Sequence, residues 1–366
     1  MLSEYKAITM KDKHSLFEKA PNIVPPALSG GMSITEIVTA MGQTSFEARK
    51  VYRGAQLYRR MIDDGDTIWL GIAGAGIAGG MGGMVISLLE NGFIDVICST
   101  GAQVYHDLHF AFDLPVKSIS PVHDDEALRQ HGDTRIYDIG IREKETLEVQ
   151  DKIIQKFVRA SYEAHLSGSS LASWEFNHAL GNWVLENSKY PERSFVACAA
   201  KHKIPVFWDS LANHSIAMNL VVTDRDGYPV RLSAQKDIFD SAAIVLAAAA
   251  TSFVELGGGG PKNFIQQTGP TINQILKIQH EGAERGLQIG TALEKEGSLS
   301  GCTFGESVTW GKYRSAAEEK LVQIWGEYSV IFPLLAAYVL DHCNQRRHQK
   351  IITRMPALTD KLENAQ

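Results

Sequence analysis

The sequence predicts an α/β fold: a Rossmann-like, mostly parallel sheet with helices on both faces, formed as a single large domain. Short apolar segments bounded by turn residues alternate with longer helical patterns along most of the chain, which indicates parallel strands joined by helices. Glycine runs directly follow two of the predicted strands, at Gly74–Gly79 and Gly257–Gly260. No internal repeat, low-complexity segment or linker divides the 366 residues, of which 44% are hydrophobic and 21% charged, so one domain accounts for them.

Two short segments flank the predicted domain. Residues 1–30 are expected to form an N-terminal extension, because Pro25 and Pro26 interrupt any helix there. Residues 31–349 are expected to form the α/β domain. Residues 350–366 are expected to be a polar, solvated C-terminal tail.

The composition excludes several classes of protein. A formal net charge of −6 argues against a nucleic-acid-binding protein, which usually carries a basic patch. The N-terminus lacks the apolar core of a signal peptide, and the most apolar window, Ala242–Leu256, is too short for a membrane span and contains a glutamate. The cysteines are far apart without CxxC spacing, so we expect reduced thiols in a cytoplasmic protein, and neither disulfides nor a zinc site. They are Cys98, Cys198, Cys302 and Cys343.

Two helix starts open the domain, at Ser33–Glu36 and Thr44–Glu47. Both match the capping-box pattern, in which a Ser or Thr precedes a Glu by three residues, and the second helix is expected to run to about Ile62. Residues 118–135 are polar and are expected to form a loop. Later helices are predicted at about 143–166, 173–186, 235–250 and 330–343, with one more ending near residue 200. Strands or closing segments are predicted at 66–72, 93–98, 204–208, 252–256, 287–292 and 320–325.

The first glycine run lies between a strand and a helical pattern. It reads Gly74-Ala-Gly76-Ile-Ala-Gly79, a GxGxxG whose glycines would allow backbone contact with a pyrophosphate at a helix N-terminus. A tight turn in an α/β core explains the glycines equally well, so both interpretations stay open. Asp95 in the next strand lies mid-strand, and we do not assign it to a ribose.

Polar residues follow two further strands, at the sheet edge where open α/β folds bind ligands. Ser99–Ala102 follows the second strand, and Asp209, Asn213 and His214 follow the strand at 204–208. The segment from Tyr105 to His109 holds potential metal ligands. No second cluster has ligand spacing, so we expect no metal.

The stretch Gly297–Arg314 carries the most specific chemistry. A Gly-Ser loop leads into a short helical pattern with Glu306 and Trp310 one turn apart, followed by Lys312. Such a set suits chemistry on an amine: the acid pairs with an ammonium, the indole gives a cation–π wall, and a desolvated lysine becomes a nucleophile. The alternative is an ordinary surface lysine after a helix with a buried tryptophan.

Taken together, these stretches resemble the deoxyhypusine synthase family from about Thr67 to Leu335. The pieces that carry the resemblance are Ser99-Thr-Gly, Ile204-Pro-Val-Phe, Leu256-Gly-Gly-Gly with Lys262, Thr291-Ala292, Gly297–Lys312 and Phe332-Pro-Leu-Leu. The resemblance implies NAD-dependent transfer of a 4-aminobutyl group from spermidine. The carbon beside the secondary amine gives a hydride to NAD, a lysine captures the butylamine part as an imine, and an acceptor amine displaces the lysine before the hydride returns. It also implies a tetramer with active sites shared between subunits.

The resemblance assigns roles to individual residues. Lys312 is the imine-forming lysine, which must be neutral, Trp310 is the wall over the substrate, and Glu306 is the anion for a substrate amine. Glu296 and Glu327 stand where the family has aspartates. The positions implied to line NAD are Gly74, Ala75, Ala78, Ser99, Thr100, Gly101, Asn213, Gly257, Gly258, Gly259, Thr291, Ala292, Glu296 and Glu327.

Departures from the family pattern concentrate in the substrate pocket. Leu299 replaces an aspartate, Asn263 a histidine and His106 a glutamate, while Asn213 and Met218 replace two aspartates. Fewer carboxylates anchor a polycation less well, which favours a different amine pair or a donor less charged at one end.

The leading hypothesis is transfer from a polyamine to a small amine, with putrescine giving homospermidine. The alternatives are modification of a lysine in a translation factor, a non-catalytic NAD- or polyamine-binding homologue, and a plain dehydrogenase.

Overall fold

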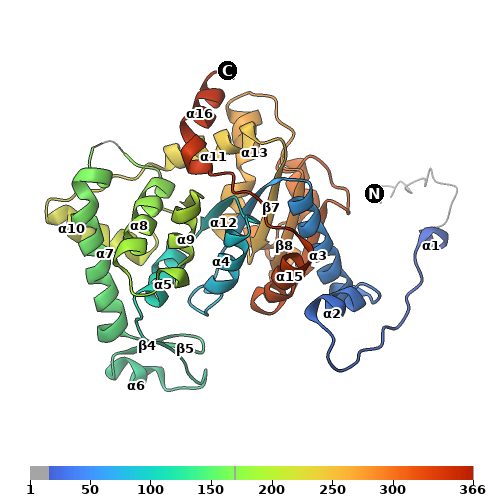
Figure 1. Ribbon diagram of the computed structural model, residues 1–366, viewed down its shortest axis with the longest axis horizontal. Coiled ribbons are helices and arrows are strands. Elements are labelled where there is room, and N and C mark those ends of the chain that lie inside the picture. The colour runs from blue at the N-terminus through green and yellow to red at the C-terminus, as the bar shows by residue number, and fades with distance from the viewer. Residues whose placement is uncertain (1–15, 169, 366) are drawn as a thin grey trace, which may run out of the picture.

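A six-stranded, fully parallel sheet forms the centre of the computed structural model, which describes residues 16–168 and 170–365 (Figure 1). The order across the sheet is β6-β2-β1-β7-β8-β9. The chain therefore starts in the middle, builds one half outward and then returns to build the other, as in Rossmann folds, with the reversal between β1 and β7. The predicted fold is confirmed. The strands are β1 Thr67–Ile72, β2 Val96–Ser99, β6 Val206–Trp208, β7 Thr251–Leu256, β8 Arg285–Gly290 and β9 Leu321–Trp325.

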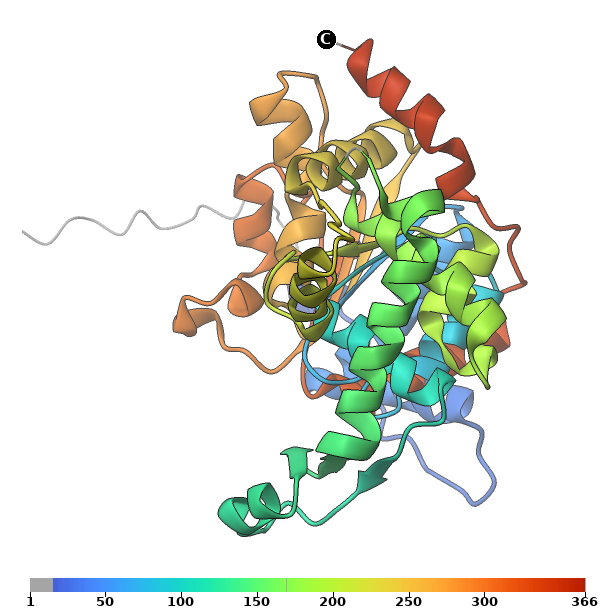
Figure 2. The ribbon, with the colours of Figure 1, turned by 90° about the vertical axis from the view of Figure 1, so that its left-hand side faces the viewer.

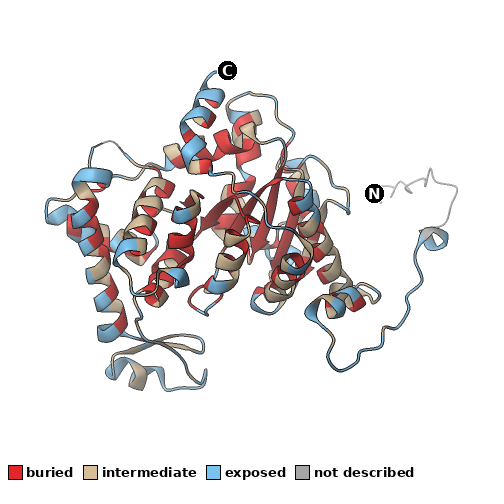
Figure 3. Ribbon diagram, viewed as in Figure 1, coloured by how far each residue is buried: buried red, intermediate tan, exposed pale blue. Residues whose placement is uncertain are grey.

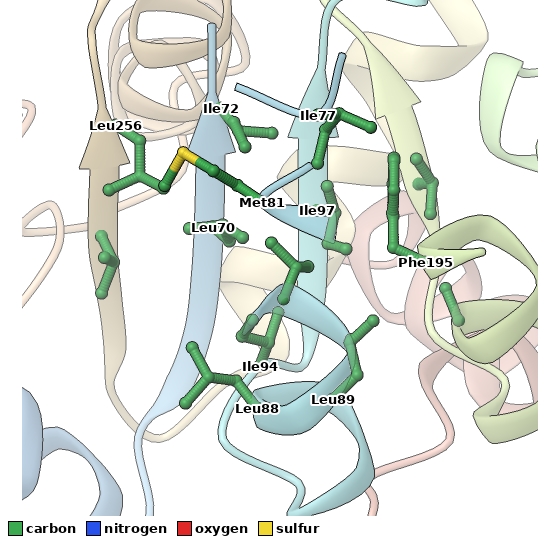
Figure 4. Packing of buried hydrophobic residues seen from close by; sticks show 14 of the residues in the cluster. Leu70, Ile72, Ile77, Met81, Leu88, Leu89, Ile94, Ile97, Phe195 and Leu256 are labelled. Atoms are coloured by element: carbon green, nitrogen blue, oxygen red, sulfur yellow. The ribbon is translucent and has the colours of Figure 1, made fainter. Parts of the chain in front are cut away.

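Helices cover both faces of the sheet, as is usual for a parallel sheet. Every residue of β1 and β7 is therefore buried. Ile68, Leu70 and Ile72 of β1 join one apolar cluster with α3, α4, α9 and α15, whereas Trp69 joins a second cluster with α11 and α16. Figure 4 shows α4 packed on the first face. The covering helices are α3 Phe46–Asp63, α4 Gly82–Glu90, α9 Phe195–His202, α11 Ala234–Ala247, α12 Gly259–Gln266, α15 Tyr328–His342 and α16 Ile351–Glu363.

The remaining elements connect the strands or pack beside the sheet and its covering helices. The other helices are α1 Leu16–Lys19, α2 Ile34–Met41, α5 Gly101–Ala111, α6 Asp125–Gln130, α7 Glu148–Ser161, α8 Ser173–Asn187, α10 Ser215–Arg225, α13 Thr268–Pro270 and α14 Phe304–Thr309, with short turns η1 Glu143–Leu147, η2 Tyr162–Leu166, η3 Pro191–Arg193, η4 Thr271–Ile275, η5 Glu294–Glu296 and η6 Leu299–Gly301. Residues 1–15 of the predicted N-terminal extension lie outside the described part of the chain.

The prediction of a solvated C-terminal tail is wrong. Residues 351–363 form α16, which packs on α11 and buries one face (Figure 3). Its buried residues, Ile351, Met355, Leu358 and Leu362, recur at helical spacing. The polar residues between them hid this stripe, and the helix covers apolar side chains that α11 would otherwise expose.

Two further local predictions are corrected. The segment predicted as a loop contains α6 and β4 (Asp133–Ile136). Strand β4 forms a three-stranded antiparallel sheet with β3 (Val116–Ser118) and β5 (Ile139–Arg142). This unit projects from the main body (Figures 1 and 2) and buries few apolar residues, so it gave no hydrophobic pattern. The Ser33 capping box forms as predicted, but α3 begins at Phe46 and not in a box at Thr44.

Neither membrane-spanning helices nor disulfides are found in the described residues. None of the described helices has the length and hydropathy needed to cross a bilayer. All four cysteines are unpaired thiols.

Candidate active site

A pocket of about 630 Å³ surrounds Lys312 beside α12 and the loop that follows β8. Its walls come from α12, the turn after it, the Gly-Ser loop (Gly297–Cys302) and α14. The lining residues are Asn263, Gln267, Pro270, Thr271, Gln274, Ile275, Glu294, Gly297, Ser298, Leu299, Cys302, Glu306, Trp310 and Lys312. Five of the six residues predicted for catalysis and substrate binding, all except His106, therefore lie in one cavity.

Lys312 is held by its backbone and half-buried at its side chain. Its N–H donates to the carbonyl of Ser307 at 3.1 Å, and its carbonyl accepts from the N–H of Ala283 at 2.9 Å. Gly311, with φ of +71°, turns the chain out of α14 to this position. Nζ donates to Oδ1 of Asn263 at 3.3 Å. Burial lowers the pKa of Lys312, which favours the neutral amine.

The acid and the indole stand at the solvent side of the pocket. Thr303 caps α14 by accepting from the N–H of Glu306 at 3.1 Å, which fixes the start of this short helix. Glu306 is exposed, and Trp310 is 63% exposed although both line the cavity. Leu299 on the facing loop is 51% exposed. The pocket thus has a half-buried floor at Lys312 and an open, partly apolar rim.

The second glycine run (Gly257–Gly260) follows β7, next to the point where the strand order reverses. Gly257, Gly258 and Gly259 have φ of +81°, +145° and +56°, which side chains disfavour. A Cβ on Gly258 would lie 2.8 Å from Cα of Ser300. The N–H of Gly259 donates to Oγ of Ser300 at 2.8 Å. This loop brings bare backbone to the sheet edge and is bonded to the loop that covers the pocket.

The first glycine turn (Gly74–Gly80) follows β1 and is filled by a tyrosine. The N–H of Gly76 donates to the Tyr328 hydroxyl at 2.9 Å, and that hydroxyl donates to the Ala73 carbonyl at 2.9 Å. A Cβ on Gly76 would meet the hydroxyl at 2.6 Å. The helix α4 starts only at Gly82, so the amide of Gly76 is not aimed at a pyrophosphate. The outer side of the turn still lines a cavity of about 680 Å³, together with Glu327.

The other residues predicted to line NAD also lie at this sheet edge, but not all in one cavity. Thr100 caps α5 and Gly101 packs under the His214 ring. Ala292 lines a separate cavity of about 430 Å³. The remaining positions are placed as follows: Gly74, Ala75 and Ala78 in the cavity of the first glycine turn, Ser99 buried at the end of β2, Asn213 exposed after β6, Thr291 bonded through its carbonyl to Trp325, and Glu296 bonded to the N–H of Leu293.

Comparison with known proteins decides the family. The model of the deoxyhypusine synthase family matches residues 36–339. "Probable deoxyhypusine synthase 2" of Methanosarcina mazei is 33% identical over 324 residues, 88% of this chain and 90% of that protein. The chain belongs to the deoxyhypusine synthase family.

Further relatives agree with this assignment. A "Deoxyhypusine synthase-like protein" of Nostoc punctiforme is 30% identical over 350 residues, 93% of this chain and 88% of that protein. The crystal structure of a deoxyhypusine synthase candidate from Entamoeba histolytica superposes with a TM-score of 0.57 at 15% identity, covering 87% of this chain and 96% of that one. At this identity the structure supports the fold alone.

His106 is the one predicted substrate residue of this deoxyhypusine synthase family member that does not line the Lys312 pocket. It lies on α5, with its Nδ1 3.0 Å from Nε2 of His109, whose other nitrogen lies 2.6 Å from Gln150. Burial lowers the pKa of both histidines. The carboxylate of neighbouring Asp107 already accepts hydrogen bonds from the Ser194 hydroxyl and from the first backbone N–H groups of α9.

Two other groups of ionisable residues have structural partners. Asp95 lies at the amino edge of the sheet, away from the pocket, where it pairs with Arg346 at 2.8 Å. Glu90, Cys198 and His202 place possible metal ligands close together. Within the described residues Glu90 already bonds Lys201 and His202, each at 2.9 Å, and these bonds account for the cluster.

Two residues at the site were given no role from the sequence. Tyr328 fills the first glycine turn from the start of α15, and nothing in the motif indicated a partner so distant in the chain. Lys262 is buried beneath the pocket, 2% exposed, with hydrogen bonds to Gln288 and Cys302. The feature of the sequence that could have indicated a role for Lys262 is its position directly after the second glycine run.

Proposed function

We propose that this member of the deoxyhypusine synthase family transfers a 4-aminobutyl group from a polyamine such as spermidine to a small acceptor amine. With putrescine as acceptor the product is homospermidine. The observation that carries the proposal is the half-buried Lys312 amine at the floor of a pocket with Glu306 and Trp310, bonded to an amide oxygen. An amine kept neutral in this way has the lone pair needed to form an imine.

Each pocket residue has a defined task in this reaction. Lys312 takes over the aminobutyl group: its nitrogen forms a bond to the oxidised carbon while 1,3-diaminopropane leaves, and the acceptor amine later displaces it. Asn263 orients the lysine nitrogen through the 3.3 Å contact. Glu306 pairs with an ammonium of the substrate, and Trp310 offers its ring face to the same charge.

NAD is the cofactor that we propose for this site. When bound, it supplies the acceptor for the hydride that leaves the donor carbon and is later returned. The second glycine run is the proposed place for such a group, because it follows β7 at the reversal point of the sheet, where Gly257 and Gly259 are partly exposed. The outer face of the first glycine turn and Glu327 would add contacts, whereas the Gly76 amide would not, since Tyr328 occupies it.

The lining of the pocket favours a small acceptor. Its carboxylates are Glu294 and Glu306, both exposed, and amides or apolar groups such as Asn263, Gln267 and Leu299 make up much of the remainder. With the donor already pairing with these carboxylates, an acceptor that brought several further ammonium groups would leave some without a counter-ion, which is costly in a partly buried site. Modification of a lysine in a translation factor is the alternative within the same chemistry.

The exposed rim supports assembly into a homotetramer with active sites at subunit interfaces. Ile275, Leu293, Leu299 and Trp310 are all more than half exposed and lie in or beside one pocket. Apolar groups gathered in this way favour a protein interface. An interface would also bring a second copy's residues to the open side of the cavity. Light scattering on the purified protein measures the assembly.

The test is reductive trapping. The protein is incubated with NAD and spermidine labelled in its aminobutyl part, treated with borohydride and analysed by peptide mass spectrometry. We expect label on Lys312, none in Lys312→Ala, and full labelling in Lys295→Ala, which removes an exposed lysine of the adjacent segment. Because burial lowers the pKa of Lys312, trapping should rise with pH and level off below the ordinary lysine pKa of about 10.4.

The products separate the competing hypotheses. Labelled homospermidine formed with putrescine supports the proposal, and label on an added protein lysine supports the alternative acceptor. Net NADH release without transfer would indicate a dehydrogenase. NAD and spermidine binding with no adduct on Lys312 would overturn catalysis and leave a binding protein.

A further inference from the structure

A second lysine lies directly beneath the pocket and is almost entirely inside the protein. Lys262, on α12, is 2% exposed. Its Nζ donates to Oε1 of Gln288 at 2.9 Å and to the Cys302 carbonyl at 2.7 Å. None of the ion pairs among the described residues includes it. A buried ammonium without a paired carboxylate is costly, so its two acceptors are the contacts that hold it there.

Those two acceptors connect loops on different sides of the site. Cys302 ends the Gly-Ser loop that covers the pocket. Gln288, on β8, donates to the carbonyls of Ser300 at 2.8 Å and Gly257 at 3.3 Å. Since the N–H of Gly259 also donates to Oγ of Ser300, the Gly-Ser loop and the second glycine run are joined through one largely part-buried set of hydrogen bonds. Lys262 is its cationic centre.

A second buried layer joins the same region to Lys312. Oε1 of Glu255 accepts from Gln266 at 2.7 Å and from the hydroxyl of Tyr313, the residue after Lys312, at 3.1 Å. Gln266 in turn accepts from Ser307 at 3.2 Å. Lys262 and Glu255 form no ion pair among the described residues but interact through their charges. Burial lowers the pKa of Lys312, and the positive charge of Lys262 adds a smaller effect in the same direction.

We propose that Lys262 is a positioning residue of the proposed reaction, which fixes the Gly-Ser loop against the second glycine run and brings a positive charge close to Lys312, whose hydrogen-bond partner Asn263 is the next residue in the chain after Lys262. The ammonium does not line the pocket and takes no part in bond formation. It acts by holding the substrate side and the cofactor side of the site at a fixed spacing. The importance of Lys262 for catalysis rests on the proposed function. Its effect on the connection between the two loops does not.

The first test needs neither substrate nor cofactor. Lys262→Met removes the charge at similar length, and Lys152→Met, on an exposed position of α7, is the matched control. Hydrogen exchange of the segments 257–259 and 297–302 should be about tenfold faster in Lys262→Met, as expected from losing a charge-assisted hydrogen bond. The control should match the wild type. Unchanged exchange in Lys262→Met would overturn the loop connection.

The second test measures the charge effect on Lys312. Competitive labelling with acetic anhydride, read by mass spectrometry across pH, reports how readily Lys312 loses its proton. In Lys262→Met the midpoint should move to higher pH, whereas Gln288→Met, which breaks the same network without removing a charge, should leave the midpoint in place while it loosens the loops. No shift in Lys262→Met, or an equal shift in both variants, would overturn the electrostatic role.

The two proposals can fail separately. If Lys262→Met does not fold, Lys262→Arg and Gln288→Met still test the loop connection, since arginine keeps the charge but not the fit. If the wild type forms no adduct with spermidine, the proposed function fails, and exchange and labelling still decide the role of Lys262. With an active wild type, trapping in Lys262→Met should fall about tenfold at neutral pH and recover partly as pH rises.

Discussion

The two glycine-rich segments of this protein follow neighbouring central strands, yet they use their glycines differently. The first glycine turn matches GxGxxG, but its inner side accommodates Tyr328, which takes the Gly76 amide. The second glycine run matches no dinucleotide motif. It has three successive left-handed residues and connects at once to the loop over the Lys312 pocket. A glycine motif therefore indicates positions where a side chain would not fit, and only the structure shows which neighbouring group occupies that space.

Adding a methyl group to Gly258 should have the largest effect. At φ of +145° an alanine is strained, and its Cβ would lie 2.8 Å from the backbone of Ser300. We expect Gly258→Ala to lower the free energy of unfolding by about 3 kcal/mol or more and to abolish NAD binding, measured by urea denaturation and calorimetry.

Gly305→Ala is the control for that variant, because a Cβ there meets nothing closer than 3.9 Å and the residue is helical. It should retain both stability and binding. Normal NAD binding by a folded Gly258→Ala protein would show that the second glycine run does not form the cofactor side of the site.

A smaller effect is expected at the first glycine turn, where the obstacle is a side chain. Gly76→Ala should cost about 1–3 kcal/mol through overpacking against Tyr328. Tyr328→Ala removes the obstacle, so the double variant should be less destabilised than the sum of the single variants by about 1 kcal/mol or more. Additive free energies of unfolding would show that Gly76 and Tyr328 are not coupled, and the contrast between the two segments would be lost.

Much of the fold was predictable because it depends on local patterns. Apolar strands, glycine turns and helical spacing gave the six strands of the sheet and several of its helices, whereas α5, α10 and α12, which follow strand ends, were not predicted. The C-terminal helix α16 escaped because four apolar residues are spread among polar ones, and the small antiparallel sheet escaped because it has little core of its own.

The site was predictable where its residues are close in the chain. Glu306, Trp310 and Lys312 come from one stretch, and their shared pocket follows from helical spacing and the turn at Gly311. Contacts between distant segments were not visible: Tyr328 reaches Gly76 from about 250 positions away, and Lys262 joins two loops through its buried ammonium. His106 was predicted beside the substrate from the resemblance, but in the single chain it lies half-buried on α5, in contact with His109.

The smallest expected effect isolates the direct hydrogen bond between the second glycine run and the pocket loop. Ser300→Ala removes the acceptor of the Gly259 N–H and should cost about 1 kcal/mol, with faster exchange of the Gly259 amide. Ser298→Ala is the matched control, since Ser298 caps the same loop by accepting from Gly301 at 3.3 Å and does not touch the glycine run. It should lose similar stability but leave the Gly259 amide protected. If both variants exposed that amide equally, the glycine run would depend on the general order of the loop and not on Ser300, and the link that distinguishes it from the first glycine turn would be refuted.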